Sequence, residues 1–141
     1  LSRQGVPLVT DGSAVATGAG IVADPDHLDA ILIGTGSEVS LCLEAAEILA
    51  REAIGVRVVS MPSWDRFEQQ PIDYRSMVLP IGVPTVSVEA GSTIGWSRYA
   101  DDCIGIDRFG ASAPGPVVLE NLGINVPHIC DVVRLKLERA K

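Results

Sequence analysis

The sequence lacks long hydrophobic runs and is poor in basic residues. Its 141 residues contain 11 Lys and Arg against 18 Asp and Glu, for a net charge of −7. The apolar runs are far shorter than the roughly 20 residues that a membrane-spanning helix needs. A nucleic-acid surface requires clustered Lys and Arg to neutralise phosphates. We therefore expect no membrane span and no nucleic-acid partner.

Cysteine is scarce as well, and its spacing excludes two further classes of protein. Cys42, Cys103 and Cys130 are odd in number, lie far apart and form no C-x-x-C pair. This pattern supports neither a zinc site nor a disulfide framework, and it favours buried, reduced thiols in a cytoplasmic protein. The chain opens with LSRQG instead of a methionine and shows no charged-then-apolar leader. We expect the C-terminal piece of a longer polypeptide.

The apolar residues form short runs that predict an α/β fold. Four runs rich in β-branched residues are bounded by turn signals, at 30–33, 56–61, 85–88 and 103–106. Helical patterns separate some of them. Apolar strands that alternate with helices predict one domain with a mostly parallel sheet covered on both faces. Residues 11–29 are rich in Gly and Asp and predict a linker with an edge strand near 20–23.

Two segments have the 3.6-residue periodicity of amphipathic helices. The apolar stripe of the first comprises Val39, Cys42, Leu43, Ala46, Leu49 and Ala50. Leu41 and Ile48 form a second seam, which indicates either ordinary core packing or contact with another domain or subunit. The second helix is expected from about Val126, with Asn125 as N-cap and Pro127 in its first turn. Its stripe comprises Val126, Ile129, Cys130, Val133 and Leu137.

Cationic side chains gather at the end of this last helix. They are Arg134, Lys136, Arg139 and Lys141, with Glu138 among them. The negative end of the helix dipole favours cations at this position. We therefore interpret the cluster as helix termination and not as a binding surface.

The segment IGTGSEV, residues 33–39, resembles the start of a nucleotide-binding unit. Gly34 and Gly36 are present, but Val39 stands where a dinucleotide fingerprint has its third glycine, and no GK[ST] follows. Thr35 and Glu38 instead fit the T-x-x-E capping box. We predict a turn that caps a helix and does not hold an anion.

Acidic residues follow the predicted strands, at Glu38, Asp65, Glu89 and Asp107. Because ligands of parallel sheets bind beyond the carboxyl ends of the strands, this acidic rim is compatible with a metal-dependent hydrolase. Capping of local turns is the competing and favoured interpretation.

Other polar and aromatic residues give no catalytic pattern. His27 lies in a turn and His128 in the first turn of the last helix, so we expect solvated or capping roles for both. Ser92 lacks the G-x-S-x-G elbow of a nucleophile. Trp96 and Tyr99, three residues apart, predict a packing face.

Six phrases taken together identify a family resemblance. LSRQ at 1–4, GTGSEV at 34–39, VRVVSMPSWDRFEQQ at 56–70, YRSMVLP at 74–80, EAGSTIGW at 89–96 and GIDRFGASAP at 105–114 resemble transketolase C-terminal regions in order and spacing. The match covers nearly the whole chain. The resemblance implies a three-layer α/β/α domain with a mixed, mostly parallel five-stranded sheet. It assigns residues 1–10 to the end of the preceding pyrimidine-binding domain, 11–29 to the linker and 30–141 to the C-terminal domain.

The same resemblance implies what the longer protein does. Transketolases are homodimers that use thiamine diphosphate and a divalent metal, Mg²⁺ or Ca²⁺. They transfer a two-carbon ketol unit from a ketose phosphate to an aldose phosphate, as in the pentose phosphate pathway. The groups that bind cofactor and metal and perform catalysis belong to the other two domains. We therefore expect no catalytic, cofactor or metal residue here, a supporting role in the dimer, and no activity of this chain alone.

One substrate-binding residue is implied by the resemblance. In transketolases the Arg of SRQ binds the phosphate of the sugar, and here that residue is Arg3. A guanidinium fork suits phosphate because it donates two charge-assisted hydrogen bonds.

Two alternatives to a transketolase domain remain open. One is the third domain of another thiamine diphosphate enzyme, such as deoxyxylulose phosphate synthase or a pyruvate dehydrogenase beta subunit; the other is a freestanding metal- or partner-binding module.

Overall fold

A five-stranded mixed sheet organises the molecule. The computed structural model describes residues 7–108 and 115–140. The strands are β1 Gly20–Ala23, β2 Ala30–Gly34, β3 Val56–Ser60, β4 Thr85–Val88 and β5 Asp102–Ile104. Their spatial order is β1-β3-β2-β4-β5, in which β1 is antiparallel to β3 and the other neighbours are parallel. The expected mixed, mostly parallel sheet is confirmed.

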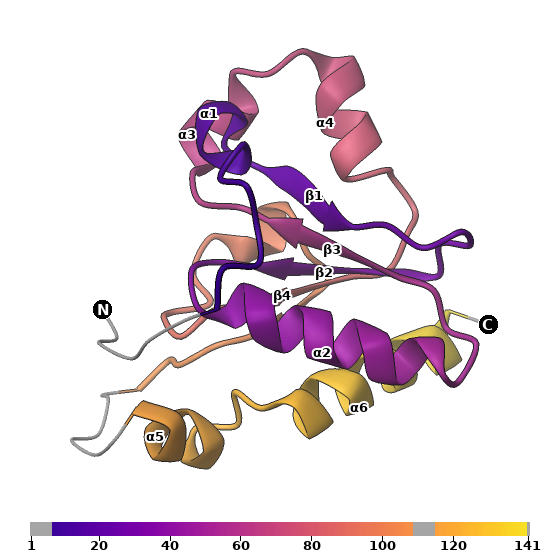
Figure 1. Cartoon of the computed structure of the whole chain (residues 1–141), viewed down its shortest axis with the longest axis vertical. Coiled ribbons are helices and arrows are strands. Elements are labelled where there is room, and N and C mark those ends of the chain that lie inside the picture. Colours follow the sequence, from indigo (N-terminus) through magenta and orange to yellow (C-terminus); the bar gives the residue numbers. More distant parts are fainter. Residues whose placement is uncertain (1–6, 109–114, 141) are drawn as a thin grey trace.

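Helices cover both faces of this sheet. They are α1 Ala14–Thr17, α2 Glu38–Ala50, α3 Trp64–Glu68, α4 Ile72–Val78, the 3₁₀ turn η1 Trp96–Arg98, α5 Gly115–Asn121 and α6 Val126–Arg139. Figure 1 shows α2 and α6 together on one side of the strands and α1, α3 and α4 on the other. The three-layer arrangement therefore follows the expectation.

The central strand β2 is buried on both faces because both layers are apolar. Ala30 and Leu32 face the cluster formed with α2 and α6, whereas Ile31 and Ile33 face the cluster with α3 and α4. This alternation follows from the two-residue repeat of a strand. A continuous apolar run is what a strand in the middle of a covered sheet needs.

The α2–α6 layer is mostly as predicted. Ile129, Cys130 and Val133 of α6 are buried, and the Asn125 side chain caps that helix by accepting from the His128 N–H at 2.9 Å. In α2 the predicted stripe is wrong at one edge, because Ala45 is buried and Ala50 is exposed. Packing against α6 places Ala45 inside, where its small side chain permits close approach: the Cys130 thiol lies 3.8 Å from its carbonyl oxygen.

The second seam of α2 divides between core and surface. Leu41 is partly buried and packs against the cluster of the α2–α6 layer, whereas Ile48 is exposed. The structure thus supports ordinary packing for Leu41.

The opposite layer uses short helices that periodicity did not predict. Phe67 of α3 and Val78 of α4 are buried against the sheet, together with Trp96 of η1. The Ser63 hydroxyl caps α3 by accepting from the Arg66 N–H. Gly18 permits this layer to close: it has φ +84°, and a Cβ there would lie 2.3 Å from the Phe67 nitrogen.

The segment 11–29 contains regular structure. Strand β1 forms one edge of the sheet at the residues where an edge strand was expected, and the short helix α1 precedes it. Tyr74 of α4 fixes this segment, because its hydroxyl contacts the Thr17 hydroxyl at 3.1 Å and donates to the Ala19 carbonyl at 2.8 Å. The boundaries of the expected domains remain a prediction.

Candidate functional site

The Gly-rich turn leads from β2 into α2, and the expected capping box is not formed. Helix α2 starts at Glu38 with Ser37 as N-cap, and Ser37 has helical φ and ψ of −67° and −24° without a side-chain cap. A capping box needs an extended N-cap residue. Here the Glu38 N–H donates to the Thr35 carbonyl, and the Ser37 hydroxyl donates to the buried Glu38 carboxylate. The predicted capping box between Thr35 and Glu38 was therefore wrong.

A cavity of about 450 Å³ opens at the carboxyl ends of the central strands. Its walls include Thr35 after β2, Ser63 after β3 and Glu89 after β4, together with Asp65 and Trp96. This is the position at which parallel sheets usually bind ligands.

The four predicted carboxylates do not share this cavity. Asp65 and Glu89 line it, whereas Glu38 is buried in the turn and Asp107 is bound by a loop. Glu89 is occupied, because its Oε2 accepts from the Trp96 Nε1–H at 2.5 Å. Within residues 7–108 and 115–140, no group of three or more His, Cys, Asp or Glu side chains is arranged to hold a metal ion. The acidic rim is thus not a metal site in the described part of the chain.

Asp107 fastens the loop that follows β4. Its carboxylate accepts from the Ser92 hydroxyl at 3.0 Å, the Thr93 N–H at 2.9 Å and the Thr93 hydroxyl at 2.7 Å. The Thr93 N–H, with the two hydroxyls, lowers the pKa of Asp107 below its usual range. Ser92 also accepts from the Ile94 N–H, so both its donor and acceptor capacity serve the loop. That Ser92 is a poor nucleophile stays a prediction.

The aromatic residues beside the cavity form a packed cluster. Trp96 is buried, and its ring lies edge-to-face with Trp64 at a centroid distance of 5.1 Å. Tyr99 is 5.7 Å from Trp64 and 6.4 Å from Trp96. The predicted packing face of Trp96 and Tyr99 is confirmed. Trp64, which completes it, was missed because it lies in a short helix.

Histidine supplies no base at this edge of the sheet. His27 is exposed, with its Nε2 2.9 Å from an oxygen of Asp29. His128 Nδ1 lies 2.6 Å from the Gly123 carbonyl oxygen. The expected solvated and capping roles match these positions.

The cysteines are free thiols that differ in exposure. Cys42 and Cys130 are buried, as expected, and Cys103 is half-buried. Burial raises the pKa of the Cys42 thiol and, less strongly, that of Cys130. Raised pKa values make these two thiols poor nucleophiles.

The cations near the end of α6 join elements together. The Arg134 fork donates to both oxygens of Glu52, at 3.0 and 2.6 Å, and its Nη1 donates to Asp131 at 2.7 Å. Lys136 lies 3.0 Å from Asp102 of β5. The hydrogen bond from Arg134 lowers the pKa of Glu52. Arg134 and Lys136 therefore have specific partners, which were not predicted from the sequence.

The implied phosphate-binding residue, Arg3, lies outside the described residues, and so does Lys141. A cluster of Glu68, Arg75 and Tyr99 on the α3–α4 side was not predicted from the sequence. Its members come from α3, from α4 and from the residue after η1, so no spacing in the sequence connects them.

The fold and the contacts at this edge of the sheet define a class of domain. It is an α/β domain with a mixed sheet, in which Glu89 and Asp107 at the carboxyl edge hold loops in place. The family model described as "Transketolase-like TK C-terminal domain" matches residues 18–125. The chain belongs to this family.

Individual relatives agree with this assignment. A transketolase from Halalkalibacterium halodurans is 42% identical over 148 residues, covering 98% of this chain and 22% of the relative. One from Nostoc sp. is 49% identical over 135 residues, covering 91% and 20%. The solved structure of transketolase from Leishmania mexicana has a TM-score of 0.89 and 42% identity, covering 94% of this chain and 20% of that chain. The chain thus spans about a fifth of the length of these relatives.

No helix in the described stretches combines the length and apolar character needed to cross a membrane.

Proposed function

We propose that this chain is the C-terminal domain of a transketolase, which transfers a two-carbon ketol unit between sugar phosphates. The observation that carries the proposal is the family match over residues 18–125 in a chain that spans a fifth of its relatives. In this proposal the longer protein is a cytoplasmic homodimer of the pentose phosphate pathway. It requires thiamine diphosphate and Mg²⁺ or Ca²⁺.

The domain itself has a supporting role in this proposal. Two carboxylates at the edge of the sheet are committed to local donors, Glu89 to Trp96 and Asp107 to Thr93. Within residues 7–108 and 115–140, no three His, Cys, Asp or Glu side chains are arranged to hold the metal. Cofactor and metal belong to the preceding domains.

Activity assays of two proteins test the proposal. The full-length protein, supplied with thiamine diphosphate and Mg²⁺, is expected to transfer ketol units from a ketose phosphate to an aldose phosphate. The 141-residue chain under the same conditions is expected to show no transfer. Absence of transfer by the full-length protein, or transfer by the chain alone, contradicts the proposal.

We also propose that Arg3 binds the phosphate of the sugar substrate in the full-length protein. Arg3→Ala is expected to weaken the use of phosphorylated acceptors by about 1.5–3 kcal/mol, or roughly 10- to 150-fold, because it removes charge-assisted hydrogen bonds. Unphosphorylated acceptors serve as the control and are expected to change much less. Arg3→Lys keeps the charge but loses the planar fork, so an intermediate loss is expected. Equal losses with both kinds of acceptor remove Arg3 from the phosphate site.

A further inference from the structure

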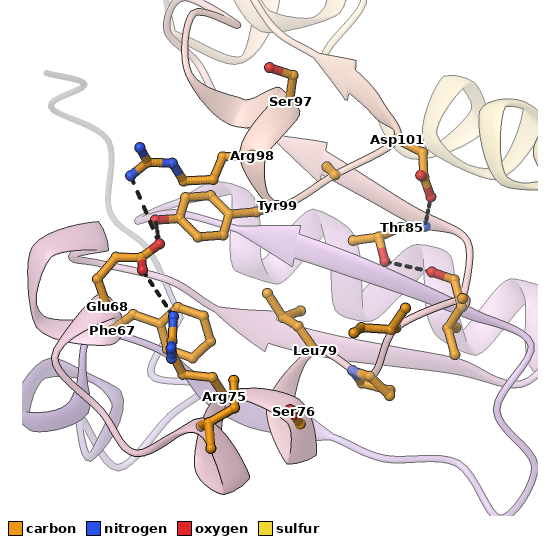
Figure 2. Close-up of a pocket in the computed structure, with 16 residues that line it drawn as sticks. Phe67, Glu68, Arg75, Ser76, Leu79, Thr85, Ser97, Arg98, Tyr99 and Asp101 are labelled. Atoms are coloured by element: carbon orange, nitrogen blue, oxygen red, sulfur yellow. Dashed lines mark hydrogen bonds and ion pairs between the residues drawn. The ribbon is translucent and has the colours of Figure 1, made fainter.

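A second cavity, of about 480 Å³, lies between α4 and η1. Thr85 at the start of β4 and Asp101 just before β5 lie on its walls, so it opens at the amino ends of these strands. Figure 2 shows its two polar ends, with Glu68, Arg75 and Arg98 at one and Asp101 beside Thr85 at the other.

One end of the cavity carries more positive than negative charge. Glu68 accepts from Arg75 Nη1 at 3.0 Å, and Arg98 Nη1 lies 3.9 Å from its other oxygen. Tyr99 also donates its hydroxyl to Glu68, at 2.7 Å. A single carboxylate thus faces two guanidinium groups, which leaves one local positive charge in a chain whose net charge is −7. Among the ion pairs of the described residues, only Glu68 is shared by two arginines.

Two arginines at this end have hydrogen-bond donors that no side chain fully occupies. The Nε of Arg75 is buried and has no hydrogen-bond partner within the described part of the chain. The Arg98 side chain is 68% exposed and makes no closer contact with Glu68 than 3.9 Å. A buried donor without an acceptor is costly, and guanidinium groups form their strongest hydrogen bonds with anions.

The middle of the cavity is apolar. Phe67 is buried beneath it, and Leu79 and Val83 add aliphatic walls. The Tyr99 ring stands edge-on to Phe67 at a centroid distance of 6.1 Å. These side chains give an organic ligand an apolar surface beside the charged groups.

The opposite end of the cavity carries a negative charge, which would orient a bound anion. The Asp101 carboxylate accepts from the Thr85 N–H at 2.9 Å, which holds a negative charge at the wall opposite the arginines. An anionic group in the cavity is repelled from Asp101 and attracted toward Arg98 and Arg75.

We propose that this cavity binds a small organic anion, with a carboxylate or phosphate group against Arg98 and Arg75 and an apolar body against Phe67, Leu79 and Val83.

Four probes distinguish the chemistry that the site recognises. Binding of phenyl phosphate, benzoate, inorganic phosphate and benzyl alcohol to the chain is measured by isothermal titration calorimetry and by amide shifts of residues 97–101. Phenyl phosphate and benzoate, which combine a charge with a ring, are expected to bind at least about threefold more tightly than the other two. A preference for one of the two identifies phosphate or carboxylate as the natural group. Benzyl alcohol binding as tightly as benzoate overturns the proposal, as does absence of binding by all four at millimolar concentration.

Variants at exposed positions test the location without unfolding the protein. Arg98→Gln is expected to weaken benzoate binding by about tenfold, whereas Arg98→Lys retains most of it because the charge remains. Ile81 is 99% exposed on the rim, so Ile81→Asp is expected to fold normally and also to weaken binding by repulsion. Arg139→Gln, on the last turn of α6, removes the same charge elsewhere and is expected to have no effect. Unchanged binding in both Arg98→Gln and Ile81→Asp refutes the assignment.

Discussion

The two faces of the sheet are built in different ways. The α2–α6 face is covered by two helices of 13 and 14 residues whose aliphatic side chains fill the core. The α3–α4 face is covered by helices of 5 and 7 residues, aromatic rings and hydrogen-bonded polar groups. Long helices bury a continuous stripe, whereas short ones need side-chain hydrogen bonds and ion pairs to fix them. The first face therefore depends mainly on packing, and the second depends more on polar contacts.

Truncation in the α2–α6 face is expected to have the largest effect. Ile129 is fully buried between α6 and the sheet. Ile129→Ala is expected to lower the free energy of unfolding by about 2–5 kcal/mol, because it removes apolar burial and leaves a cavity. Urea denaturation followed by circular dichroism measures the change.

A control on the same helix separates packing from helix propensity. Leu135 is 52% exposed. Leu135→Ala is expected to change stability by no more than about 0.5 kcal/mol. Similar losses for Ile129→Ala and Leu135→Ala contradict a packing-dominated face.

The same difference explains why the helices of one face could be predicted from the sequence and those of the other could not. Helix α6, its cap Asn125 and its stripe follow from a periodic pattern more than three turns long. The same rule misjudged Ala45 and Ala50 in α2, because the contact with α6 decides which small residue is inside. In α3 and α4, fewer than two turns carry no measurable period. Local signals such as the Ser63 cap were present but do not reveal what the helices pack against.

Prediction of the candidate sites was also limited by tertiary contacts that the sequence does not reveal. Glu38, Asp65, Glu89 and Asp107 follow strands, and this position in the sequence correctly placed Asp65 and Glu89 at one cavity. Sequence position does not show which donors occupy a carboxylate. Trp96 is the partner of Glu89, and it comes from a loop whose course depends on tertiary contacts.

Removing a mostly buried cation from the α3–α4 face tests its dependence on polar contacts. Arg57 of β3 is 12% exposed, binds both oxygens of Asp24 at 2.8 and 3.0 Å, and donates to the Met77 carbonyl at the end of α4 at 2.6 Å. Arg57→Met is expected to cost about 1.5–3 kcal/mol, because Asp24 and the last carbonyls of α4 lose their donor.

The matched variant on the other face is Arg134→Met. Arg134 also forms a two-pronged ion pair, with Glu52, but both side chains are more than a third exposed. Solvent screening makes such pairs weak, so a clearly smaller loss than for Arg57→Met is expected. Urea midpoints of the two variants give the comparison, and a loss for Arg134→Met that equals or exceeds that for Arg57→Met removes the distinction between the faces.

The smallest effect is expected at the loop after β4, and it depends on pH. The Thr93 N–H and the hydroxyls of Thr93 and Ser92 lower the pKa of Asp107 in the folded protein. A lowered pKa stabilises the fold above the unfolded value, near 3.9, and this contribution disappears as the pH falls through the folded value. The stability difference between the wild type and Asp107→Asn is therefore expected to be constant at neutral pH and to shrink below about pH 4. In the wild type the amide shift of Thr93 is expected to titrate below the usual range of aspartate. A difference that stays constant down to the acid transition shows that Asp107 does not hold this loop through its charge.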